Sequence, residues 1–166
     1  MSLNSPCASV AALIVACLGF SASAKDHVPI KGEFVTEFAF VSPPPVAQVI
    51  LTGSGLVSHL GKATCFSPDG VVDFTQQPLP TLTGTLELTA ADGDTLIGGI
   101  DCLAVPAPDG SITFAGTLTF TGGTGRFEGA TGSAELSGQG APTSAFGGVG
   151  WFAIDGNVSS PGAGKK

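Results

Sequence analysis

The side chains best placed for chemistry lie in a glycine-rich run, GGTGRFEGATG, at residues 122–132. Its marked positions are Gly122, Gly123, Gly125, Arg126, Phe127, Glu128, Gly129 and Gly132. A run of this kind cradles phosphate when it carries a Lys-Ser/Thr pair or opens a helix after a strand. Neither feature accompanies it here. We therefore expect a tight structural connection, in which glycine lets the backbone bend, rather than a nucleotide site.

Arg126 is the only arginine of the chain. A guanidinium group can pair with a nearby carboxylate of the protein, or it can bind the carboxylate of a ligand. We expect the first role, in which Arg126 pins the glycine-rich connection in place.

Few other residues could act as catalysts or ligands. Glu37 is our candidate acid or base, because it falls on an expected early strand. His59 precedes a turn at Gly61, and we expect its ring to brace that turn. No metal site or cofactor is expected, since the chain has no Cys-x-x-Cys motif and its two histidines are far apart.

The first 24 residues predict a signal peptide. No charged side chain occurs before Lys25, residues 10–20 are apolar, and Ala22-Ser23-Ala24 has the small-x-small pattern of a cleavage site after Ala24. The alternative is a lipoprotein site at Cys17. The apolar stretch is too short for a membrane span, so the processed chain is expected to be periplasmic or extracellular, with no integral span.

Cysteine usage agrees with export. Cys65 and Cys102 remain after processing, and an even pair in an oxidising compartment predicts a disulfide. The alternative is two buried free thiols on different strands.

Composition favours one small β-domain. The formal net charge is −7, and no cluster of Lys or Arg is present to neutralise phosphates, which argues against nucleic acid as a partner. Glycine and threonine are abundant. We expect a single domain over residues 25–158 and a disordered tail over 159–166.

The elements that position these residues are strands. In residues 32–41 the side chains of Phe34, Thr36, Phe38 and Phe40 share one face, and Glu37 lies on the other. Similar segments follow between Gly, Pro and Asp-Gly turns, and Asp69-Gly70 predicts a hairpin that splits residues 62–76 into two strands. Eight or nine antiparallel strands with one buried face predict a closed eight-stranded barrel. A β-sandwich is the alternative.

The segment TFTGGTGRFEGATGSAEL resembles the glycine-rich segment of the allene oxide cyclase and dirigent barrel superfamily, with an order most similar to the cyclase branch. The whole chain resembles small exported bacterial barrels of this type. The resemblance implies an eight-stranded antiparallel barrel. It transfers no active site, because the family's catalytic tyrosine has no counterpart in a chain without tyrosine, and the only asparagines are Asn4 and Asn157.

Three functions are compatible with such a barrel. The first is binding of a small apolar molecule in an aromatic interior. The candidate lining residues are Phe34, Phe38, Phe40, Phe74 and Phe114. The second is an isomerase or cyclase in which Glu37 does acid–base work. The third is a structural or surface-interaction protein that forms a homo-oligomer through the barrel wall.

Overall fold

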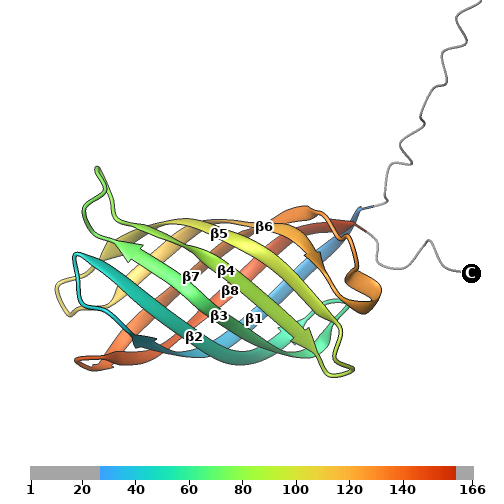
Figure 1. The fold of residues 1–166 in the computed structure, drawn as a ribbon, viewed down its shortest axis with the longest axis horizontal. Helices are drawn as coiled ribbons and strands as arrows, with labels where there is room; N and C mark the ends of the chain where they lie inside the picture. Colours follow the sequence, from blue (N-terminus) through green and yellow to red (C-terminus); the bar gives the residue numbers. More distant parts are fainter. Residues whose placement is uncertain (1–26, 160–166) are drawn as a thin grey trace, which may run out of the picture.

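The computed structural model describes residues 27–159, which form a closed barrel of eight antiparallel strands (Figure 1). Each strand pairs with the next one in the chain, and β8 pairs with β1 to close the sheet. The strands are β1 (His27–Phe40), β2 (Val46–Val57), β3 (Gly61–Asp73), β4 (Thr81–Ala90), β5 (Thr95–Pro106), β6 (Ile112–Gly123), β7 (Gly132–Ser144) and β8 (Gly147–Ser159). The closed barrel is confirmed, and the sandwich alternative is excluded.

The alternation of side chains sets which face of each strand is buried. On β1, Phe34 and Thr36 are buried in the interior, and Glu33, Val35 and Glu37 are exposed. Side chains of successive residues point to opposite faces of a sheet, so one face of every strand fills the barrel. Closure leaves no unpaired strand edge.

The two ends of the barrel differ in the connections they carry. The β1–β2, β3–β4, β5–β6 and β7–β8 connections lie at one end, which we call the open end. The β2–β3, β4–β5 and β6–β7 connections lie at the other, which we call the plugged end (right in Figure 1). The β6–β7 connection contains a short 3-10 helix, η1 (Gly125–Phe127). The buried Leu60, Phe127 and Ala130 close this end.

The hairpin expected at Asp69-Gly70 is wrong. These residues form a bulge within the single strand β3, where the pairing shifts between Val49–Gly70 and Leu51–Ser67. The carboxylate of Asp69 accepts hydrogen bonds from the backbone N–H and the hydroxyl of Thr85, at 2.7 and 2.9 Å, and so ties the bulge to β4. A bulge bends a strand without reversing it. The barrel consequently has eight strands.

The expected disulfide is not formed. Cys65 and Cys102 are free and buried. Cys65 on β3 pairs with Leu88 of β4, whereas Cys102 on β5 pairs with Leu82 of the same strand. Six residues of strand correspond to about 20 Å, and the intervening strand separates β3 from β5 by about 10 Å. A disulfide requires Cα atoms closer than about 7 Å.

The two ends of the chain extend beyond the described region. The expected signal peptide over residues 1–24, the alternative lipidation at Cys17 and residues 160–166 all lie outside the described residues. Ser159 is the last residue of β8. Within residues 27–159, no helix is long and apolar enough to cross a membrane.

Candidate functional site

A cavity occupies the interior of the barrel at its open end. Its volume is ≈ 100 Å³. The residues that line it are mostly apolar and come from all eight strands, among them Phe38, Phe40, Leu51, Leu82, Ile112 and Phe114. An apolar concave site of this kind is the usual form of a small-molecule site in a barrel.

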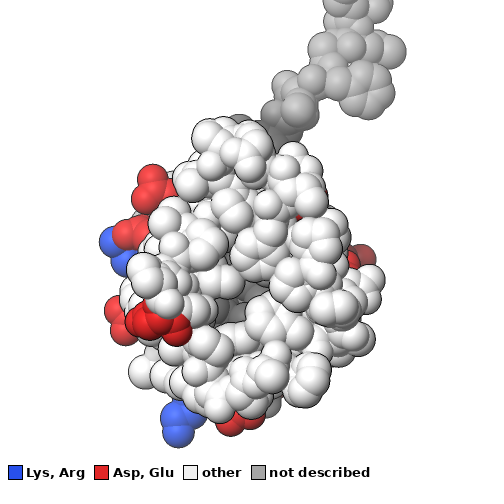
Figure 2. Space-filling view, turned by 90° about the vertical axis from the view of Figure 1, so that its left-hand side faces the viewer, with Lys and Arg blue, Asp and Glu red and all other residues white. Residues whose placement is uncertain are grey.

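The cavity leads to a recess of ≈ 480 Å³ at the rim of the open end. Phe40, Gly110 and Ile112 border both spaces, so the recess lies directly outside the cavity. The rim itself carries Phe74 and the exposed Phe146. Figure 2 looks onto this end and shows a hollow surrounded by uncharged residues, with the charged side chains toward the edge of the view.

A smaller chamber of ≈ 30 Å³ lies deeper in the barrel. Leu51, Leu82 and Phe114 border both the chamber and the cavity and form the partition between them. Ser67 and Phe152 line the chamber but not the cavity. Toward the plugged end, tightly packed apolar side chains such as Leu88, Leu96, Leu118, Phe120 and Phe127 fill the interior.

Glycines on β7 and β8 leave room for the cavity. A Cβ atom on Gly140 would lie 3.2 Å from the ring of Phe38, and one on Gly148 would lie 2.8 Å from it. The ring of Phe38 therefore packs against two residues that have no side chains. It meets Phe40 edge to face, with 5.5 Å between ring centroids. Larger residues on β7 and β8 would push these rings into the open space.

The lining offers few polar groups. Thr36 and Gln139 carry its only polar side chains, and no Asp, Glu, His, Lys or Arg of the described residues lines the cavity. Glu37 lies on the outer surface of β1, because its neighbours Thr36 and Phe38 face inward. The site can therefore provide shape, apolar contact and one or two neutral hydrogen bonds.

The structure separates the five phenylalanines expected to line a ligand site. Phe38, Phe40 and Phe114 line the cavity, and Phe74 lines the rim recess. Phe34 is buried in the filled part of the barrel, where it stacks on Phe152 with ring centroids 4.7 Å apart. The inward residue between Phe34 and Phe38 is Thr36, which the sequence pattern had placed on the same face without assigning it a role.

The glycine-rich run closes the plugged end. Gly125 has a φ of +58°, in the left-handed region that favours glycine. A Cβ atom there would overlap the carboxylate of Asp94. This backbone conformation turns η1 inward, so that the side chain of Phe127 is fully buried in the core.

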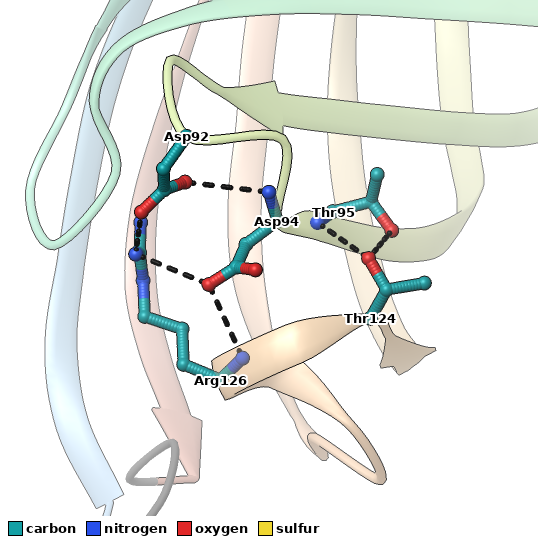
Figure 3. A network of polar contacts seen from close by, with 5 residues as sticks. All are labelled: Asp92, Asp94, Thr95, Thr124 and Arg126. Carbon is teal, nitrogen blue, oxygen red and sulfur yellow. Dashed lines mark hydrogen bonds and ion pairs between the residues drawn. The ribbon is translucent and has the colours of Figure 1, made fainter.

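Arg126 holds this connection to the β4–β5 turn, as Figure 3 shows. Its guanidinium group pairs with the carboxylates of Asp92 and Asp94, the latter at 3.2 Å, and its backbone N–H donates to Asp94. The hydrogen bond from Arg126 lowers the pKa of Asp92 below its ordinary value. Thr124 accepts a hydrogen bond from the backbone N–H of Thr95. The side chain of Arg126 thus pairs with carboxylates of the protein itself.

His59 lies in the β2–β3 turn at the same end. Its Nε2 atom is hydrogen-bonded to the carbonyl of Pro29, at 2.9 Å. The ring therefore braces the turn against the start of β1, as expected.

Comparison with known proteins identifies the fold. No family model matches the chain, and no curated protein sequence does. The solved structure of a pterocarpan synthase dirigent protein superimposes with a TM-score of 0.53, covering 85% of this chain and 90% of that one at 15% sequence identity. At this identity the likeness shows the fold alone. The dirigent-like barrel expected from the glycine-rich segment is confirmed.

Proposed function

We propose that the protein binds small, uncharged, apolar molecules in the open half of its barrel. The observation that carries the proposal is the cavity of ≈ 100 Å³, which is bordered by apolar side chains and reaches the rim recess. A barrel of eight strands is just wide enough either to be filled by side chains or to hold one small ligand. Here the plugged half is filled and the open half is not.

The dimensions indicate the size of the ligand. An apolar cavity of roughly 150 Å³ in an engineered protein accommodates benzene. The cavity described here is smaller, at ≈ 100 Å³, so it suits a short branched chain, or a single ring that also reaches toward the rim recess. A longer molecule would extend past Phe40 and Ile112 into the rim recess of ≈ 480 Å³.

Binding is favoured over the isomerase or cyclase alternative by the position of the carboxylates. An acid or base must come within hydrogen-bond reach of the reacting group. Glu37 faces outward, whereas the inward residues at this level are Thr36 and Phe38. The likeness to a dirigent protein leaves the chemistry open, because it concerns the fold alone.

The proposal can be tested with a substitution that fills the cavity and leaves the strands around it in place. Ala104 is buried and lines the cavity, so Ala104→Leu places three additional carbon atoms in the space. Calorimetric titration of the protein with toluene is expected to show saturable binding that this substitution weakens by about tenfold or more, because the added side chain occupies the volume of the ring.

The matched control is Ala115→Leu, the same substitution at an exposed position on the outer face of β6. It is expected to leave the affinity for toluene unchanged. Absence of saturable binding to the unsubstituted protein, or an equal loss in both variants, would refute the proposed site.

A further inference from the structure

We propose that the hydroxyl of Thr36 selects, among small apolar molecules, those with a neutral hydrogen-bond acceptor such as a carbonyl or ether oxygen. This inference rests on the proposed function, since it assigns a polar contact within the same cavity. It names a class of ligand that the apolar lining alone does not define.

The first support is the burial of Thr36 within the cavity. Only 3% of the residue is exposed to solvent, yet it borders the cavity. Its hydroxyl oxygen lies over the backbone of Gly150, another lining residue, where an added Cβ would come within 3.2 Å of it. Its methyl group faces the opposite neighbour, Gly53. The side chain is therefore oriented with its polar atom toward the β8 side of the cavity wall.

The second support is that no hydrogen bond joins this hydroxyl to another described residue, and that its oxygen is still reachable from the cavity, since Arg126 Nε is the only fully enclosed unpaired side-chain atom of residues 27–159. A hydroxyl group offers one donor hydrogen and two acceptor lone pairs. Leaving a buried donor unpaired is unfavourable, and buried polar groups are usually paired for this reason. A ligand oxygen that accepts from Thr36 would satisfy the donor.

The residues that line the cavity favour a neutral ligand oxygen over a charged one. No Lys, Arg or His among the described residues lines the cavity, so an ionised carboxylate or phosphate would lose its hydration without gaining a counter-charge. A neutral carbonyl or ether oxygen loses much less. The remaining contacts of such a ligand would be with Phe38, Leu51 and Phe114, which are apolar.

A second buried hydroxyl provides a comparison. Ser67 is also 3% exposed and has no hydrogen-bond partner among the described residues, but it lines the deeper chamber, beyond the partition of Leu51, Leu82 and Phe114. With a volume of ≈ 30 Å³, this chamber has room for about one water molecule and not for a ring. Ser67 therefore should not contribute to selection.

The experiment uses two probes of nearly the same shape, cyclohexanone and methylenecyclohexane, which differ in an oxygen atom and a methylene group. Their affinities for the full-length protein are measured by calorimetric titration. The quantity of interest is the ratio of the two affinities, compared between the unsubstituted protein and Thr36→Val, which removes the hydroxyl and keeps the branched shape. The affinity for cyclohexanone divided by that for methylenecyclohexane is expected to be about five- to tenfold lower in Thr36→Val. This is the usual effect of losing one neutral hydrogen bond.

Two further variants separate selection from a structural role. Thr36→Ser keeps a hydroxyl and should preserve the ratio, and Ser67→Ala should leave it unchanged. Thr36→Val should also raise the thermal midpoint of the ligand-free protein, because it removes an unpaired buried polar group. If the role of Thr36 is structural, Thr36→Val would instead lower that midpoint and reduce the affinities for both probes equally.

The outcomes distinguish the two proposals. If neither probe binds, the proposed function fails. If both bind and Thr36→Val leaves their ratio unchanged, or if Ser67→Ala is the variant that alters it, the cavity is a binding site and the assignment to Thr36 is overturned.

Discussion

The plugged and open halves of the barrel use the same strands and the same alternation of side chains, yet one is solid and the other hollow. At the plugged end, η1 places the fully buried Phe127 in the core, and Leu60 and Ala130 complete the closure. At the open end, the connections form a rim around a recess. The connections at the two ends, together with the glycines that face Phe38 on β7 and β8, distinguish the filled half of the interior from the hollow half.

Two phenylalanines of β1 illustrate the contrast. Phe34 and Phe38 are four residues apart on the same inward face. Phe34 stacks on Phe152 in the packed half, whereas Phe38 lies against Gly140 and Gly148 and borders empty space. The same side chain thus stabilises the core in one half and shapes a cavity in the other.

The largest expected difference between the halves is in unfolding free energy. Phe127→Ala should reduce it by about 3–5 kcal/mol, because the substitution leaves a cavity surrounded by packed side chains. Phe38→Ala should reduce it by only about 1–2 kcal/mol, because the lost ring already borders open space and fewer contacts are removed. Urea denaturation followed by circular dichroism measures both values.

Each variant is the control for the other, since both remove a phenylalanine ring from the barrel interior. Equal losses of stability, or a larger loss for Phe38→Ala, would contradict the division into a solid and a hollow half.

The two buried thiols, Cys65 and Cys102, make the stability of the packed core depend on pH. Burial raises the pKa of Cys65 to about 12 and, with a smaller contribution from the charge of Asp101, that of Cys102 to about 11. The unfolded chain releases these protons near the ordinary thiol pKa, so above about pH 9 it binds fewer protons than the folded protein. Stability should therefore fall from pH 9 to 11, by about 1.4 kcal/mol per pH unit for each thiol.

Chemical denaturation at pH 8, 9, 10 and 11 measures this slope. A variant with both cysteines replaced by alanine is the control and should lose the part of the slope that the thiols cause. Under denaturing, non-reducing conditions, thiol titration of the unsubstituted protein should find both Cys65 and Cys102 reactive. Absence of these reactive thiols would show that the two residues are bonded and would contradict the register of β3, β4 and β5.

Most of the fold was predictable from the sequence because it depends on local patterns. The alternation around Phe34 and Thr36, the proline-rich stop after β1 and the Asp-Gly turn at Asp92 each identify a strand or its end without reference to the rest of the chain. The role of Arg126 was also predictable, since a single arginine beside several carboxylates is expected to pair with one.

The errors and omissions concern features that depend on register. Asp69-Gly70 has the local sequence of a hairpin, but its pairing with Val49 and Thr85 makes it a bulge. The disulfide was expected from the number of cysteines, and their placement across β4 prevents it. The division of the barrel into two halves depends on which inward positions of facing strands are glycines, and one strand's pattern does not contain this information.

The most direct test of the account is to locate a bound ligand within the barrel. Nuclear Overhauser effects between toluene and methyl groups of the isotopically labelled protein report contacts shorter than about 5 Å. We expect signals to Leu51, Leu82 and Ile112, which line the cavity, and none to the packed Leu96, Leu118 and Val158. Signals to the packed residues, or only to outward methyl groups such as those of Val35 and Leu56, would contradict it.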